Sequence, residues 1–68
     1  MNICAPFAGI VHLEVAEGDT VDTGQTIAVV ETVKLQAPVV APGPGTIAAI
    51  NVANFADVTG GDVLLELK

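Results

Sequence analysis

The chain has 68 residues and carries eight carboxylate side chains against two lysines and no arginine, so its formal net charge at pH 7 is -6. Binding to nucleic acids or to anionic membranes requires clustered basic residues, and these two classes of partner are therefore excluded. This length allows one small domain, which we take as residues 1–68.

A membrane span and a disulfide are also not expected. Apolar residues make up 51% of the chain, but Pro38, Pro42 and Pro44 interrupt the longest uncharged stretch and prevent it from forming one spanning helix. The N-terminus lacks the basic region of a signal peptide, so we expect a soluble cytoplasmic protein. Cys4 is the single cysteine. It is expected to be a small, partly buried apolar residue.

Short apolar stretches separated by turn residues run through the whole chain, and no stretch has the period of an amphipathic helix. This pattern is typical of β-structure. The main reverse turns are Glu17–Thr20 and Pro42–Gly45, because their glycine, aspartate and proline residues favour turn conformations. The predicted strands, in chain order, are Ile3–Ala5, Ile10–Ala16, Ile27–Glu31, Gln36–Val40, Thr46–Val52 and Val63–Leu67.

The sequence contains one internal repeat. The Ala-Pro-x-x-Gly motif of Ala5–Gly9 returns at Ala41–Gly45, and the Val-x-x-Gly motif of Val21–Gly24 returns at Val58–Gly61. The second half carries one residue more than the first half between these two motifs. Each half is too small to cover its own apolar face. We therefore expect an all-β fold in which the halves cover one another as a small sandwich with quasi-two-fold symmetry.

The segment Glu31–Gln36 joins the two halves. If the strands on either side of it pair as a hairpin, Lys34 lies at or beside the exposed tip, at one pole of the domain. A lone lysine in such a place is ordinarily a solvated charge. Here, however, it is the only lysine or arginine before the last residue, Lys68, and it lies at the break in the repeat. This position makes Lys34 the candidate functional residue.

These motifs resemble the biotinyl/lipoyl attachment domain family, most closely its biotin carboxyl carrier members. The resemblance covers residues 5–67 and implies a flattened barrel-sandwich hybrid of two small antiparallel sheets. It also implies that Lys34, on a tight turn between two strands, is the modified lysine. Five motifs keep their register around this lysine: Ala5-Pro6-x-Ala8-Gly9, Glu17-Gly18-Asp19-Thr20-Val21-x-x-Gly24-Gln25, Glu31-x-x-Lys34, Ala41-Pro42-x-x-Gly45 and Val58-x-x-Gly61.

The residues beside Lys34 bear on which cofactor it carries. Biotinyl members usually contain Ala-Met-Lys-Met, whereas lipoyl members usually have aspartate before the lysine and alanine after it. Val33 and Leu35 are bulky and apolar like the methionines, Thr32 is closer to the lipoyl pattern, and Glu31 fits both. The resemblance therefore implies biotin attached at Lys34, with Glu31, Thr32, Val33 and Leu35 contacting the ligase and partners. Covalent lipoate and an unmodified chain are the alternatives.

The implied function is that of a carrier without catalytic residues of its own. Its implied partners are a biotin protein ligase, a biotin carboxylase and a carboxyltransferase, and residues 31–36 are those that we expect the ligase to contact. A lipoyl carrier of a 2-oxoacid dehydrogenase-type complex and an unmodified interaction module of the same fold are the alternative functions. His12 has no second histidine or cysteine at ligand spacing, so no metal site is predicted and an outward strand position is expected.

Two departures from the family pattern concern the backbone. The stretch Gly9–Gly18 is one residue shorter than in the family, which predicts that its strand lacks a bulge. In the second half, Phe55-Ala56 stands where the family has a Gly-Asp pair. Bulky residues rarely adopt a positive φ, so we expect another turn geometry there, involving Asn54. Phe55 is expected to pack over the core, and an exposed contact is the alternative.

Overall fold

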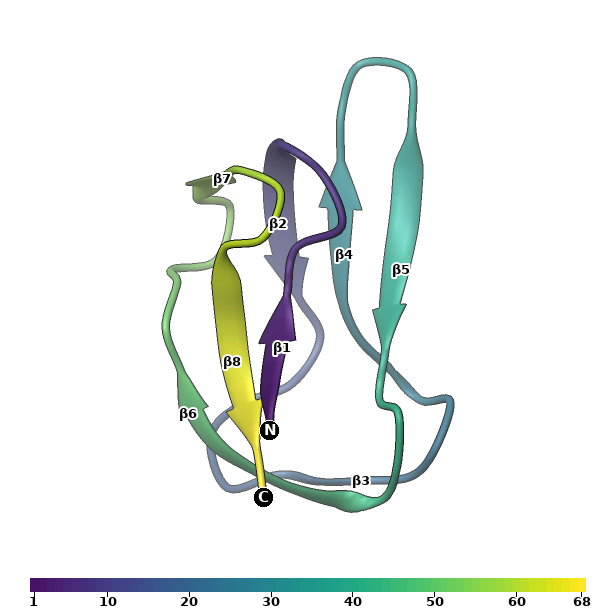
Figure 1. Ribbon diagram of the computed structural model, residues 1–68, viewed down its shortest axis with the longest axis vertical. Coiled ribbons are helices and arrows are strands. Elements are labelled where there is room, and N and C mark those ends of the chain that lie inside the picture. Colours follow the sequence, from purple (N-terminus) through teal and green to yellow (C-terminus); the bar gives the residue numbers. More distant parts are fainter.

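The computed structural model describes residues 1–68 and is built entirely from short antiparallel strands (Figure 1). No helix of a length and apolarity that could cross a membrane is present. The eight strands are β1 (Asn2–Cys4), β2 (Gly9–Leu13), β3 (Thr20–Val21), β4 (Thr26–Glu31), β5 (Gln36–Val40), β6 (Gly45–Ile50), β7 (Asp57–Val58) and β8 (Val63–Leu67).

The six predicted strands are all present, with differences at some ends, and two further strands, β3 and β7, accompany them. The ranges predicted for β5 and β8 agree with the structure at both ends. The strand predicted to continue to Ala16 ends at Leu13. Glu14 still donates to the carbonyl of Ile27 at 3.0 Å, whereas the N–H of Ala16 donates to the carboxylate of Asp19 at 2.9 Å and so does not pair with a strand. β3 and β7 were not predicted. Each has only two residues, too few to show an alternating pattern.

The strands form two four-stranded sheets, with the orders β1-β8-β6-β3 and β5-β4-β2-β7. The repeat makes β1 equivalent to β5, β8 to β4, β6 to β2 and β3 to β7. When each strand is replaced by its equivalent, the order of one sheet becomes the order of the other. The quasi-two-fold symmetry is therefore present in the topology. The halves do not lie as one sheet against another, as the repeat alone suggested, because each sheet takes two strands from each half.

The repeated motifs hold the two halves together through equivalent hydrogen bonds. Ala5 donates to the carbonyl of Asp62 at 2.8 Å and accepts from Gly61 at 2.9 Å. In the same way, Ala41 donates to the carbonyl of Gln25 at 2.9 Å and accepts from Gly24 at 2.8 Å. Thus the Ala-Pro motif of each half binds the Val-x-x-Gly turn of the other half. The glycine of each turn has a positive φ, 81° at Gly24 and 91° at Gly61, which a residue with a Cβ rarely adopts.

The extra residue of the second half forms a bulge. β2 pairs with β4 in unbroken register from Ile10 to Leu13, whereas the register between β6 and β8 shifts between Ile47 and Ala49. At this shift, Ala48 has no paired residue on β8. The prediction that the first-half strand lacks a bulge is confirmed. Beyond the bulge, Ala49 is the equivalent of His12, since Ala49 pairs with Glu66 as His12 pairs with Val29.

The core is apolar throughout, and the two halves contribute seven and six residues to it. Thirteen residues are buried, and none of them is polar or charged. They include six repeat-equivalent pairs: Ala5 and Ala41, Val11 and Ile47, Val21 and Val58, Ile27 and Leu64, Ala28 and Leu65, and Val30 and Leu67. Cys4 is exposed, which corrects the expectation of a partly buried side chain. It follows buried Ile3 on the edge strand β1 and precedes buried Ala5, and so faces outward.

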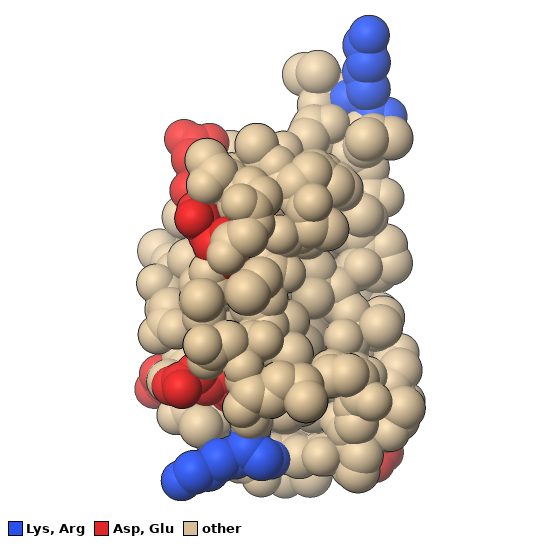
Figure 2. All heavy atoms as spheres, in the orientation of Figure 1, with Lys and Arg blue, Asp and Glu red and all other residues tan.

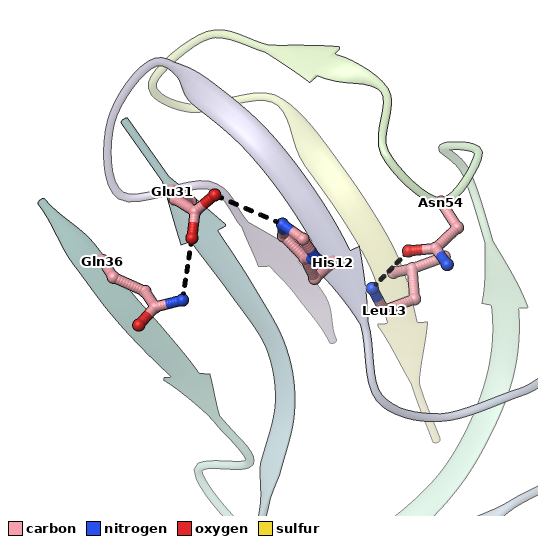
Figure 3. A network of polar contacts seen from close by, with 5 residues as sticks. All are labelled: His12, Leu13, Glu31, Gln36 and Asn54. Carbon is pink, nitrogen blue, oxygen red and sulfur yellow. Dashed lines mark hydrogen bonds and ion pairs between the residues drawn. The ribbon is translucent and has the colours of Figure 1, made fainter. Parts of the chain in front are cut away.

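The turn at Phe55 differs from the sequence expectation in two respects. Phe55 has a φ of 67°, so this bulky residue does adopt the left-handed conformation, and 62% of its surface is exposed. The left-handed conformation of Phe55 follows from the repeat. The N–H of Phe55 donates to the carbonyl of Val11 at 2.7 Å, and the N–H of its equivalent, Gly18, donates to the carbonyl of Ile47 at 2.8 Å. Asn54 takes part in another way. Its Oδ1 accepts from the N–H of Leu13 at 2.8 Å (Figure 3).

Close backbone approach explains why the Ala-Pro-x-x-Gly motif ends in glycine in both halves. A Cβ on Gly9 would lie 2.5 Å from the carbonyl oxygen of Glu31. A Cβ on Gly45 would collide with the carbonyl oxygen of Lys68 and lie 3.2 Å from the Leu67 side chain.

Gly45→Ala is therefore expected to lower the free energy of unfolding by about 1–3 kcal/mol, because the strands must move apart to admit the methyl group. Urea denaturation followed by far-UV circular dichroism measures this change. Gly43→Ala is the matched control: a Cβ there meets no atom within 4 Å, and the change is expected to stay within about 0.5 kcal/mol. Equal destabilisation by both variants would contradict the role assigned to Gly45.

Candidate functional site

The β4–β5 hairpin extends beyond the rest of the domain at one end of the molecule (Figure 1). Its strands pair from Thr26–Val40 to Glu31–Gln36, and the four residues Thr32–Leu35 connect them. The N–H of Thr32 donates to the carbonyl of Leu35 at 2.7 Å. The Thr32 hydroxyl oxygen accepts from the N–H of Lys34 at 3.3 Å and of Leu35 at 3.1 Å. Thr32 therefore fixes the turn without any residue of positive φ.

Lys34 lies at the tip of this hairpin and is exposed, as predicted. The two lysines of the chain lie at opposite ends of the molecule, one at the hairpin tip and one beside the C-terminus (Figure 2). Lys34 has no carboxylate partner, since the single close contact between a basic and an acidic side chain joins His12 and Glu31. No pocket surrounds it either. The hairpin consequently presents a free primary amine at a fixed position and does not enclose a ligand.

Two exposed apolar side chains flank Lys34. Val33 is fully exposed, with a relative accessibility of 102%, and Leu35 is 62% exposed. They are two of only five large apolar residues exposed on the whole surface. An apolar side chain on a projecting turn gains nothing from the core of its own domain. This placement is typical of a surface that packs against another protein.

Glu31 lies at the base of the hairpin and links it to the sheet. Its Oε2 accepts from Nε2 of Gln36, directly opposite on β5, at 2.9 Å, and its Oε1 lies 3.7 Å from Nε2 of His12 on β2 (Figure 3). His12 is on the outward face, as predicted. Its contact with Glu31 was not predicted, because it depends on the pairing of β2 with β4, which places Ile10 opposite Glu31. The register of the two strands was the missing information.

The comparisons with known proteins agree with this geometry. The chain belongs to the family described as "Biotin-requiring enzyme", which matches residues 1–67. It is 40% identical over 67 residues to the biotin-dependent acyl-coenzyme A carboxylase alpha3 subunit of Mycobacterium leprae (strain TN), a match that covers 97% of this chain and 11% of that protein.

A second relative carries the name of a lipoyl protein. The chain is 36% identical over 59 residues to the dihydrolipoyllysine-residue acetyltransferase component of the pyruvate dehydrogenase complex of Mycoplasma capricolum subsp. capricolum, and the match covers 87% of this chain and 14% of that protein. The chain thus spans only a small part of these relatives.

A solved structure described as a single-chain, multi-domain long-chain acyl-CoA carboxylase superposes with a TM-score of 0.89 at 29% identity, over 96% of this chain and 6% of that one. The expected barrel-sandwich fold is confirmed. Together these matches define a biotin/lipoyl attachment domain, a carrier that is not itself catalytic.

Proposed function

We propose that this domain is a biotin carboxyl carrier, in which Lys34 bears biotin and moves a carboxyl group between a biotin carboxylase and a carboxyltransferase. The observation that carries the proposal is the Val33-Lys34-Leu35 tip: one unpaired amine, held on a rigid turn between two exposed apolar side chains. The carboxylase relative supports the same cofactor. The bulky flanks resemble the methionines that surround the lysine in biotinyl members of the family.

Attachment requires only that the amine be reachable and correctly placed. The ε-nitrogen of Lys34 would attack the carbonyl carbon of an acyl-adenylate held by the ligase, a C–N amide bond would form, and AMP would leave with the electrons of the broken C–O bond. A lysine ammonium is not nucleophilic, so a base of the ligase must accept its proton. The domain contributes position, because the Thr32 hydroxyl holds the turn that carries the amine and lowers the orientation cost.

The remainder of the proposed function follows from tethering. Bound biotin supplies a ureido nitrogen that accepts and releases a carboxyl group. The domain confines this group to the reach of one flexible arm, so that both partner sites meet it at a high effective concentration. The hairpin projects from the body of the domain (Figure 1), which leaves space for the walls of a partner cleft around the tip.

Intact-mass measurement after co-expression with a biotin protein ligase tests the proposal. We expect one biotinyl increment on the unaltered chain, no increment on Lys34→Ala, and a full increment on Lys68→Ala, which removes the only other lysine. An unaltered chain that gains no mass would contradict the proposal. So would an increment that survives in Lys34→Ala.

The second candidate function is that of a lipoyl carrier, favoured by the acetyltransferase relative and by Thr32. The same experiment with a lipoate ligase separates the two. A lipoyl increment on Lys34, with no biotinyl increment in the parallel experiment, would select this function and place the domain in an acyl-transfer complex.

A further inference from the structure

A row of four contacting side chains crosses the outer face of the sheet that carries the hairpin. We call Gln36, Glu31, His12 and Phe55 the outer row. Gln36 donates to Glu31 at 2.9 Å and Glu31 lies 3.7 Å from His12 (Figure 3). The rings of His12 and Phe55 meet edge to face, with centroids 4.8 Å apart and an interplanar angle of 83°. The row therefore runs continuously from the base of the Lys34 hairpin to an exposed aromatic ring.

The internal repeat shows that the fold does not require these side chains. The other sheet has the same strands in the same arrangement, and its equivalents of Phe55, His12 and Glu31 are Gly18, Ala49 and Lys68. None of these three side chains is aromatic or acidic. One sheet folds without an outer row, so packing alone does not account for the row on the sheet that bears the attachment hairpin.

Phe55 is moreover kept at a conformational cost. Its φ of 67° lies in the left-handed region, where a Cβ is disfavoured, while its equivalent Gly18 adopts a φ of 91° without this penalty. The ring gains little burial in return, since the residue is 62% exposed. An exposed aromatic side chain held in a strained conformation is a feature of binding surfaces, where aromatic residues often contribute most of the affinity.

The charge around the ring indicates the chemistry of the partner. Asp57 lies opposite Ile10, and Ile10 lies opposite Glu31, so the two carboxylates share this outer face with Phe55 nearby. The chain has no arginine, and its two lysines lie at the hairpin tip and at the C-terminus. The surface is thus an aromatic ridge with acidic neighbours. It is complementary to an apolar hollow that is bordered by arginine or lysine.

The length of the Lys34 side chain, to which the ligase attaches biotin, indicates which partner needs this surface. A ligase acts on the unmodified lysine, so its active site must come within one lysine side chain of the hairpin and must cover the base of the hairpin as well. An enzyme that acts on the end of the attached arm can remain farther away. A stable protein interface involves roughly 20 residues on each side, far more than the four-residue turn offers. The adjoining outer row extends the contact surface.

We infer that the outer row is the docking surface for the biotin protein ligase, with Phe55 entering an apolar hollow and Glu31 facing its basic border. This inference rests on the proposed function. The four residues act in recognition of the folded domain, outside the Val33-Lys34-Leu35 tip that enters the active site of the ligase.

Steady-state biotinylation of the purified chain by a purified biotin protein ligase, at varied chain concentration, tests the inference. Phe55→Gly restores the residue found at the equivalent position and relieves the strained φ. We expect its KM to rise about tenfold with kcat within twofold, while its urea midpoint is unchanged or higher. His12→Ala, which also copies the other sheet, is expected to raise KM about threefold. Val40→Ala removes an exposed apolar side chain at the far end of β5 and is expected to leave KM within twofold.

The outcomes separate the inference from the proposed function. An unaltered chain that the ligase does not modify would contradict the proposed function itself. A modified chain whose KM is the same in Phe55→Gly would overturn the inference alone. An equal rise of KM in Val40→Ala, or a lower urea midpoint for Phe55→Gly, would also overturn it, because the effect would then reflect general disturbance of the fold.

Discussion

Moving the attachment lysine by a single position is expected to slow biotinylation at least 100-fold. In the double variant Val33→Lys, Lys34→Ala the amine remains on the same turn, and position 33 is at least as accessible as any other on the tip, since Val33 is fully exposed. The direction and height of the amine change, and the apolar side chain of Val33 is lost with them. A reacting group displaced by a residue loses the orientation that the rigid turn provides, which costs on the order of 100-fold in rate.

Intact-mass time courses with limiting ligase measure this effect. The urea midpoint of the double variant is the control, because an exposed turn position is expected to change stability by no more than about 0.5 kcal/mol. If the double variant were biotinylated as fast as the unaltered chain, exposure of an amine would be the sole requirement. The geometric role that we assign to the Thr32–Leu35 turn would then be wrong.

The largest loss of stability is expected from Leu64→Ala. Leu64 lies on β8 and is fully buried in the core shared by the two halves. Removing a buried leucine side chain costs about 2–5 kcal/mol, including the cavity that it leaves. At about 0.05–0.15 kcal/mol per residue, a 68-residue domain has a total stability of about 3–10 kcal/mol. A substantial fraction of Leu64→Ala is therefore expected to be unfolded at 37 °C.

Leu35→Ala is the matched control, because it removes the same side chain at a position that is 62% exposed. Its free energy of unfolding is expected to stay within about 0.5 kcal/mol of the unaltered chain. The chain has no tryptophan or tyrosine, so urea denaturation is best followed by far-UV circular dichroism. A Leu64→Ala variant as stable as Leu35→Ala would contradict the core described above.

The fold was largely predictable because the repeat and the turn residues are local features of the sequence. The strands Gln36–Val40 and Val63–Leu67 follow from short patterns, and the exposed Lys34 follows from the break in the repeat. The missing bulge after Gly9 follows from comparison with the family spacing. The exchange of strands between the halves was not predictable in this way. Which strand pairs with which is decided by contacts between distant residues, such as those of Ala5 with Gly61 and Asp62.

The same distinction explains what was missed at the site. The turn residues around Lys34 are neighbours in sequence, so their grouping was evident. The outer row was not, because His12, Glu31 and Phe55 come from three separate segments that are brought together by strand register. The conformation of Phe55 was predicted wrongly from its residue type. The hydrogen bond from Phe55 to Val11, equivalent to that from Gly18 to Ile47, outweighs the intrinsic preference of a bulky residue.

The interleaved order of the strands also bears on when the domain can form during protein synthesis. β8 lies between β1 and β6 in its sheet, so the N-terminal strand has no neighbour until the last strand has been made. A nascent chain that ends before Val63 lacks three of the thirteen buried core residues, Leu64, Leu65 and Leu67. Folding must therefore await release of the final strand from the ribosome. An enzyme that recognises the assembled surface can act only after β8 has joined its sheet.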